Sequence, residues 1–280
     1  MSARRLVVNG LKGLVGLLGG RNQLRLKRVL SDALGLQCVT QETHGTPFGP
    51  IHFYSPNDLT RWRAETFFTK EPETLEWIDS FSPGDVLWDV GANVGLYTLY
   101  AARRGVRVLA FEPLSGNYYV INRNIEINGF SDLAMAYCLA LADETTVGAF
   151  LLQDGQMGAA CNSFNEPVGY DGNHYRPVFS QGMVGYRADD FLEHFKVPAP
   201  NHLKIDVDGI EDKIVLGAQG LLRGPQLKSI SIELDAGRPD HTGQIVKQIE
   251  EAGFVLVSQK HSEIIDGPTS TIYNYLFRRR

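Results

Sequence analysis

Apolar residues follow two patterns that alternate along most of the chain. From about residue 80 onward, short apolar runs alternate with segments in which apolar residues recur every three or four positions. The runs predict β-strands and the recurring positions predict amphipathic helices. The predicted strands are Val86–Val90, Arg107–Phe111, Leu133–Leu139, Val147–Leu152, His202–Val207, Leu227–Leu234, Phe254–Ser258 and Thr271–Arg278. The predicted helices are Val94–Arg103, Ser115–Asn128, Glu211–Leu222 and Thr242–Ala252, with another starting near Pro72.

Repeated strand–helix–strand units predict an α/β fold with an open, mostly parallel sheet and helices on both faces. Such sheets bind ligands just beyond the carboxyl ends of their strands. We assign residues 61–280 to this domain and residues 1–60 to an N-terminal extension, with short strands near Leu36–Thr40 and Pro50–Tyr54. Residues 153–182 are rich in Gly, Asn and Tyr without a period, which predicts a long loop.

Composition narrows the class of protein. The 280 residues are 43% hydrophobic, which excludes a disordered chain and is enough for a large core. Cys38, Cys138 and Cys161 are scattered and form no C-x-x-C pair, so we expect a reducing, cytoplasmic environment. The net charge of −5 argues against general nucleic-acid binding.

The N-terminal segment is basic, in contrast to the rest of the chain. Residues 1–35 carry seven Lys or Arg and one Asp, and apolar residues from Val7 to Leu18 fall on one helical face. One interpretation is a helix that packs on the protein. The other is a helix within residues 1–30 that contacts a membrane surface with anionic lipids.

A glycine loop follows the first predicted strand of the domain, from Asp89 to Gly95. Its G-x-x-x-G spacing, from Gly91 to Gly95, matches neither the dinucleotide fingerprint nor the P-loop. Those loops cradle phosphates, whereas Asp89 would repel a pyrophosphate and suit a ligand that carries ammonium and sulfonium groups. The alternative is a tight turn that needs glycine only for its backbone shape.

Glu112 follows the next predicted strand, 21 residues beyond Gly91. An acidic residue at about this distance accepts hydrogen bonds from ribose hydroxyls in nucleotide-binding folds. A surface glutamate before a helix is the alternative.

A charged block ends the strand that begins at His202. Lys204, Asp206 and Asp208 alternate, so they share one side of an extended chain. Three charges at the end of an apolar strand indicate a functional site, although an ion-paired rim is the simpler alternative. A Mg²⁺ site built from Asp206, Asp208 and Glu211 is a third interpretation, which we do not adopt because no EF-hand spacing supports it.

Together these motifs resemble those of the FkbM-type family of S-adenosylmethionine-dependent methyltransferases. The resemblance rests on Val86–Gly95, Phe111–Pro113, Lys204–Glu211, Leu216–Ala218 and Asn274–Phe277, and it covers about residues 65–280. It implies a Rossmann-like sheet of seven strands, the last of them antiparallel, and O-methylation of a hydroxyl on a sugar, glycan or other natural product.

The same resemblance implies roles for individual residues. Asp89, Gly91, Asn93 and Gly95 would surround the methionine part of S-adenosylmethionine, and Glu112 would hold its ribose. Asp143 would lie near the adenine. Glu73, in the helix before the first strand, would close over the cofactor. No metal is expected.

Three residues are candidates for catalysis. Asp206, which the resemblance places opposite the transferable methyl, is the first candidate for the base that accepts the hydroxyl proton. Lys204 would orient Asp206 or an acceptor oxygen. His174 is the best of seven histidines, because it lies in the aperiodic stretch whose aromatic and amide side chains suit a sugar.

Two other functions stay open from the sequence. One is N-methylation of a small molecule, although no Asn-Pro-Pro-Tyr follows the charged strand. The other is a membrane-associated protein that binds the cofactor without catalysis. The identity of the acceptor and the oligomeric state cannot be read from the sequence.

Overall fold

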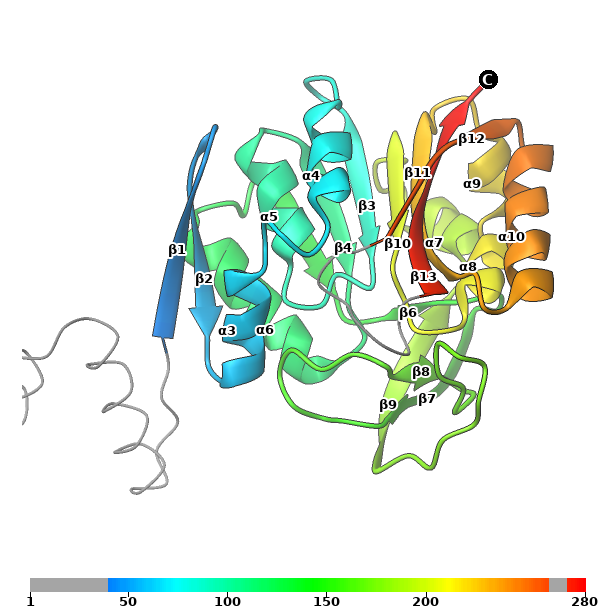
Figure 1. The fold of residues 1–280 in the computed structure, drawn as a ribbon, viewed down its shortest axis with the longest axis horizontal. Helices are drawn as coiled ribbons and strands as arrows, with labels where there is room; N and C mark the ends of the chain where they lie inside the picture. The colour runs from blue at the N-terminus through cyan, green and yellow to red at the C-terminus, as the bar shows by residue number, and fades with distance from the viewer. Residues whose placement is uncertain (1–39, 262–270) are drawn as a thin grey trace, which may run out of the picture.

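The computed structural model describes residues 40–261 and 271–280, and a seven-stranded sheet lies at its centre (Figure 1). The strands of this sheet are β3 (Val86–Val90), β4 (Arg107–Phe111), β5 (Ala134–Tyr137), β10 (His202–Ile205), β11 (Ser229–Asp235), β12 (Phe254–His261) and β13 (Ile272–Arg279). The helices around it are α4 (Pro72–Asp79), α5 (Leu96–Arg103), α6 (Ser115–Ile127), α7 (Ala188–Phe195), α8 (Glu211–Gly217), α9 (Gln219–Arg223) and α10 (Pro239–Glu251).

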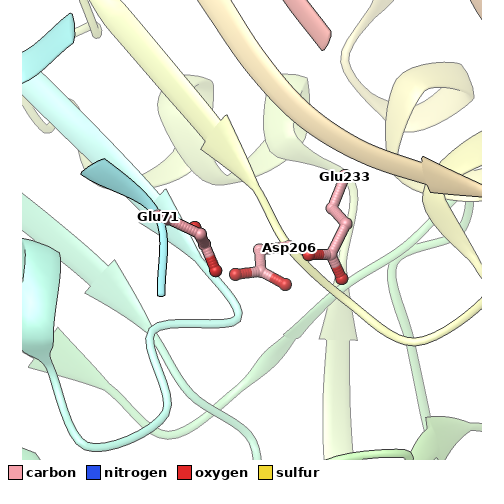
Figure 2. A group of neighbouring side chains, drawn as sticks. All are labelled: Glu71, Asp206 and Glu233. Carbon is pink, nitrogen blue, oxygen red and sulfur yellow. The ribbon is translucent and has the colours of Figure 1, made fainter. Parts of the chain in front are cut away.

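The strand order confirms the predicted fold class. The order is β12-β13-β11-β10-β3-β4-β5, and only the last strand, β13, runs antiparallel to its neighbours. From β3 the chain adds β4 and β5 on one side of the sheet. It then returns and adds β10 and the remaining strands on the other side of β3. This reversal creates a crevice at the carboxyl ends of β3 and β10, which is where open sheets of this class bind ligands. At this edge Glu71, Asp206 and Glu233 point toward one another (Figure 2).

Each face of the sheet has its own apolar core because alternate side chains of each strand point to opposite faces. On one face, Leu87 and Val108 pack among residues of α4, α5 and α6. On the other face, Trp88 and Leu109 pack among residues of α7 to α10. Burial on both faces explains why these strands are continuous apolar runs in the sequence.

A smaller sheet and a hairpin complete the described part of the chain. The smaller sheet is formed by β6 (Ala140–Leu141), β7 (Thr146–Leu152), β8 (Ser163–Phe164) and β9 (Phe179–Tyr186). The hairpin β1 (Thr40–Thr46) and β2 (Gly49–Ser55) is followed by α3 (Asp58–Glu65). The amide of Asn124 on α6 bonds the backbone of Tyr54, which ties the hairpin to the main domain.

The structure departs from the predicted elements in several places, and β1, β6 and α3 were not predicted. The segment 153–182 is not one loop, because it holds β8 and the start of β9. The strand β9 and the helix α7 were missed altogether. The predicted helix Glu211–Leu222 divides into α8 and α9 at Gly217, where an added Cβ would lie 2.0 Å from the carbonyl oxygen of Ala142.

The proposed basic helix and the strand near Leu36 fall largely outside the described residues. Among residues 40–261 and 271–280, no helix is long and apolar enough to cross a bilayer. The membrane-contact interpretation of residues 1–30 therefore stays a prediction.

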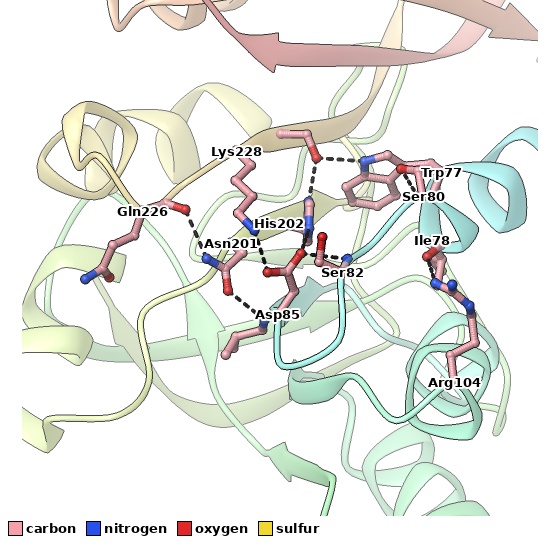
Figure 3. A network of polar contacts seen from close by, with 12 residues as sticks. Trp77, Ile78, Ser80, Ser82, Asp85, Arg104, Asn201, His202, Gln226 and Lys228 are labelled. Carbon is pink, nitrogen blue, oxygen red and sulfur yellow. Dashed lines mark hydrogen bonds and ion pairs between the residues drawn. The ribbon is translucent and has the colours of Figure 1, made fainter.

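A buried polar network joins the amino ends of β3, β10 and β11, at the edge opposite the crevice (Figure 3). Asp85 lies between His202 Nε2 at 2.9 Å and Lys228 Nζ at 2.6 Å. His202 Nδ1 lies 2.7 Å from Ser229 Oγ, which accepts a hydrogen bond from Trp77 Nε1. A neutral His202 ring satisfies this row of hydrogen bonds. Its Nε2–H donates to the Asp85 carboxylate, and its Nδ1 accepts from the Ser229 hydroxyl.

Burial lowers the pKa of His202 to about 4, although the Asp85 carboxylate opposes this shift. The ion pair suggested by the short contact with Asp85 is therefore not the state we expect near neutral pH. The folded protein resists protonation of this ring, whereas an unfolded chain takes up the proton below about pH 6.5.

We predict that the free energy of unfolding rises with pH between about 4 and 6.5. The unfolded state binds one more proton than the folded state in this window, a contribution on the order of 3 kcal/mol. Urea unfolding of wild type and His202→Gln across this window checks the prediction, with the exposed His194→Gln as control. The slope of the free energy of unfolding against pH should fall in His202→Gln and not in His194→Gln. An unchanged slope in His202→Gln would contradict the prediction.

Candidate active site

A cavity opens at the carboxyl ends of β3, β4, β10 and β11. One end is apolar, and the other carries ionisable side chains. The apolar end includes Phe111, Leu139, Leu141, Phe150 and Phe164. The charged end includes Lys70, Asp206, Asp208 and Glu233. Between them lie Gly91, Asn93 and Glu112, from the two loops that the sequence singled out.

Gly91 brings the first loop into direct contact with the strand beside it. Its φ is +79°, and an added Cβ would lie 1.9 Å from the carbonyl oxygen of Asp206. The N–H groups of Gly91 and Ala92 both donate to the carbonyl of Phe111, at 3.0 and 3.1 Å. Glycine is therefore required here for a close backbone approach as well as for its backbone shape.

Glu112 holds the same loop from the other side. Its Oε2 accepts a hydrogen bond from the N–H of Asn93 at 2.7 Å, and its Oε1 accepts one from the N–H of Leu114 at 2.8 Å. Burial raises the pKa of Glu112 to about 7, although the two N–H groups oppose this shift. The side chain of Asn117 also bonds this carboxyl group, which still has acceptor capacity left for a ligand.

A backbone strap, residues 157–161, forms part of the cavity wall through Ala159 and Ala160. Asn93 Nδ2 and Asn117 Nδ2 both donate to the carbonyl of Ala159, at 2.9 and 3.0 Å. Asp208 accepts a hydrogen bond from the N–H of Cys161. Burial and the charge of Asp206 raise the pKa of Asp208 to about 6, against the opposing effect of that N–H. The strap is thus anchored to both the glycine loop and the charged block.

The charged end is built by sheet register. Lys204 lies beside Asp89 on β3 and beside Ser231 on β11. One step further along the same face, Asp206 follows β10, and Glu233 lies on β11 opposite Asn274 of β13. Strand periodicity therefore stacks two rows of charged groups on the face covered by α4 and α5.

Lys204 is the centre of this arrangement. Its ammonium bonds Asp206 Oδ2 and lies 4.8 Å from the centroid of the Tyr97 ring. Burial alone would lower the pKa of Lys204, but the carboxylates of Asp206, Glu71 and Asp89 outweigh it and raise this pKa. Lys204 is therefore charged at neutral pH.

One group of carboxylates, Glu71, Asp206 and Glu233, is compact enough to share a cation among the residues that the structure describes. Their nearest oxygens lie within 4.8 Å of one another. Lys70 Nζ already lies 2.8 Å from Glu71, and Lys204 is bonded to Asp206. The chain's own ammonium groups offset much of the charge, so we assign no metal. Glu211, part of the Mg²⁺ alternative, accepts instead from the N–H of Gly209.

A family model matches the part of the chain that forms most of the cavity. Residues 89–256 match the family model described as the methyltransferase FkbM domain. The chain belongs to the FkbM family of methyltransferases. This match covers more than half of the chain and includes the glycine loop, Glu112, the charged block and Glu233.

Two methyltransferases are similar to this chain over somewhat less than two thirds of its length. The hexuronic acid methyltransferase AglP of Haloferax volcanii is 23% identical over 179 residues, which cover 63% of this chain and 66% of AglP. The 31-O-demethyl-FK506 methyltransferase FkbM of Streptomyces tacrolimicus is 23% identical over 201 residues, covering 64% of this chain and 75% of that protein. The chain therefore spans slightly less than two thirds of AglP.

A solved structure of an FkbM methyltransferase from Methylobacillus flagellatus is also similar. It is 17% identical, with a TM-score of 0.46, and the match covers 71% of this chain and 44% of that one.

Several predicted site residues lie away from the cavity wall. Asp89 is buried beneath α5, where its Oδ2 accepts from Thr98 Oγ1 at 2.6 Å. Asp143 lines a separate depression with Lys213. Glu73 accepts from Asn274 Nδ2 at 2.9 Å. His174 is exposed and pairs through its backbone with Val168. An added Cβ at Gly95 would meet Ile121, so this glycine allows α6 to pack closely.

Other residues of the site escaped the sequence analysis. Glu233, Lys70, Arg63 and Asn117 all line the cavity. Glu233 carried a usable signal, because it is a charge inside the apolar run Leu227–Leu234, the same feature that drew attention to Lys204. The sequence carries no such signal for Lys70, Arg63 and Asn117, because they lie in helices and connections whose packing depends on tertiary structure.

We predict that Gly91→Ala is far more destabilising than Gly105→Ala. Both glycines have similar φ, +79° and +82°, but an added Cβ at Gly105 meets nothing within 4 Å. Gly105→Ala should lower the free energy of unfolding only by the cost of a positive φ for alanine, about 1–2 kcal/mol. Gly91→Ala should lose roughly 3 kcal/mol or more, because the loop must also move off Asp206. Chemical denaturation measures both, and equal losses would refute the close-approach argument.

Proposed function

We propose that this protein transfers the methyl group of S-adenosylmethionine to a hydroxyl of a sugar or a similar polyhydroxylated small molecule. The observation that carries the proposal is the cavity itself. It is lined by Gly91, Asn93 and Glu112 at its middle and by Asp206 at its charged end. The FkbM resemblance assigned these four residues to the cofactor or to the reaction, together with others that lie away from the cavity wall.

The chemistry of the lining fits S-adenosylmethionine. The Oδ1 atom of Asn93 is buried without a hydrogen-bond partner, so the site offers an acceptor that the folded chain leaves unused. Glu112 retains acceptor capacity for the hydroxyls of a ribose. The carboxyl groups at the charged end suit a ligand that carries positive charge.

The two ends of the cavity orient such a ligand. An adenine ring suits the apolar end, between Phe111, Leu141 and Phe164. With the ribose held at Glu112, the methionine part then extends over Gly91 toward Asp206. The reacting centre would therefore lie beside Asp206 and Glu233.

When bound, S-adenosylmethionine supplies a methyl group on a sulfonium, which is already activated for transfer. The protein has to align the acceptor oxygen, exclude water and accept a proton. The strap at 157–161 forms part of the cavity wall and would limit water access on that side. Lys204 fixes Asp206, so the polar wall that faces the acceptor is rigid.

An oxygen acceptor on a sugar-like or natural-product molecule is supported by the names of two relatives. AglP, by its name, acts on a hexuronic acid, which is a sugar derivative. The 31-O-demethyl-FK506 methyltransferase is named for an oxygen position. Arg63 and Lys70 line the cavity and provide donors for hydroxyl or carboxylate oxygens of an acceptor.

We predict that Glu112→Ala weakens S-adenosylmethionine binding by roughly 1–3 kcal/mol, because the ribose hydroxyls and two backbone N–H groups lose their acceptor. Calorimetric titration with S-adenosylmethionine, S-adenosylhomocysteine and NAD measures this effect. Glu126→Ala, which removes an exposed glutamate of α6, is the matched control. The wild type should bind the first two ligands and not NAD.

Two results would count against the proposal. Unchanged affinity in Glu112→Ala would remove the ribose assignment. Absence of binding of both adenosyl ligands to the wild type would remove the function itself.

A further inference from the structure

Glu233 differs from the other carboxylates of the charged end in having no partner. Glu71 is paired with Lys70, and one oxygen of Asp206 is bonded to Lys204. Within residues 40–261 and 271–280, Glu233 forms no hydrogen bond or ion pair, yet it is partly buried and lines the cavity. A carboxylate in this situation is available to a ligand.

The sheet fixes Glu233 beside the expected reacting centre. The residue lies within β11, directly across from Asn274 of β13. Asn274 is itself held by Glu73 at 2.9 Å. On the other side, Asp206 extends from β10, and the side chains of both acids point into the same space (Figure 2). A group placed by a strand between two others is held more precisely than one on a loop.

We propose that Glu233 is the catalytic base that takes the proton from the acceptor hydroxyl, while the Lys204–Asp206 pair positions the acceptor. This inference rests on the proposed function. The acceptor oxygen forms a C–O bond to the methyl carbon as the C–S bond breaks, and the C–S electron pair stays on sulfur. The hydroxyl proton passes to a carboxylate oxygen of Glu233.

The electrostatics of the site support this assignment. Burial raises the pKa of Glu233 well above its ordinary value, and the charges of Asp206 and Glu71 add to the effect, against Lys70 and Lys204. The carboxyl group is therefore favoured in its neutral form while the site is empty, and the positive charge of a bound sulfonium favours its ionised form, which can accept a proton. One oxygen of Asp206 is bonded to the ammonium of Lys204, so Asp206 is less free to accept a proton.

The test uses two ligands that differ at the reacting centre and requires no acceptor. Sinefungin carries an amine where S-adenosylmethionine carries its sulfonium methyl, and S-adenosylhomocysteine carries neither charge nor methyl there. Calorimetry in buffers of different ionisation enthalpy gives affinity and proton release for each ligand. The proteins are wild type, Glu233→Gln, Asp206→Asn and Glu250→Gln, the last an exposed control on α10.

Wild type and Glu250→Gln should bind sinefungin about tenfold or more tightly than S-adenosylhomocysteine, because its ammonium meets an ionised carboxylate. Sinefungin should also release a proton that S-adenosylhomocysteine does not. Glu233→Gln should lose both effects while binding S-adenosylhomocysteine as the wild type does. Its amide keeps the shape of the side chain, and thermal unfolding checks that the variant folds.

Other results overturn the assignment. If Glu233→Gln keeps the preference and Asp206→Asn loses it, Asp206 is the base. If Mg²⁺ abolishes the preference in the wild type, the carboxylates hold a cation instead. If the wild type shows no preference, no free carboxylate faces the reacting centre. If neither ligand binds the wild type, the proposed function fails, and the assignment of Glu233 fails with it.

Discussion

The site depends on one close backbone contact, between Gly91 and the carbonyl group of Asp206. The loop after β3 can reach the end of β10 only because Gly91 has no side chain and adopts a positive φ. The N–H of Asp206 donates in turn to the carbonyl of Val90 at 3.0 Å. This contact brings the glycine loop and the charged block into one crevice. Glu112 then fixes the loop by accepting the N–H of Asn93, so the two motifs have a fixed geometry relative to each other.

The same contact explains the charge distribution. Once β3, β10 and β11 align in register, Asp89 and Lys204 form one row, and Asp206 and Glu233 form the next. Buried charges are costly unless they are paired, and Lys70 and Lys204 supply the pairing for Glu71 and Asp206. The polar network of Asp85, His202 and Ser229 lies at the opposite end of these strands. It holds the strands in register far from the chemistry.

Much of this architecture is predictable from the sequence because the central strands are buried on both faces. Val86–Val90 and Arg107–Phe111 have the predicted bounds, since each is a short apolar run between turn signals. The strand β9 was missed because Gly182 and Gly185 interrupt its apolar pattern. Asp206 and Glu112 could be placed at the cavity because they directly follow strands. Glu73 was predicted to close over the cofactor, but the turn into α4, which tertiary packing sets, directs Glu73 to Asn274 and Glu71 to the charged end. Asp143 was assigned through the family resemblance and His174 through the composition of its stretch, and packing directs both elsewhere.

The central claim is that the loop at Gly91, Glu112 and the charged end form one cofactor site whose reacting centre faces Asp206 and Glu233. A crystal structure of the protein with S-adenosylhomocysteine tests it most directly. The account predicts ribose hydroxyls within hydrogen-bond distance of Glu112, the adenine among Phe111, Leu141 and Phe164, and the sulfur directed toward Asp206 and Glu233. A ligand bound with its ribose away from Glu112, or with its sulfur directed away from the two carboxylates, would contradict the account.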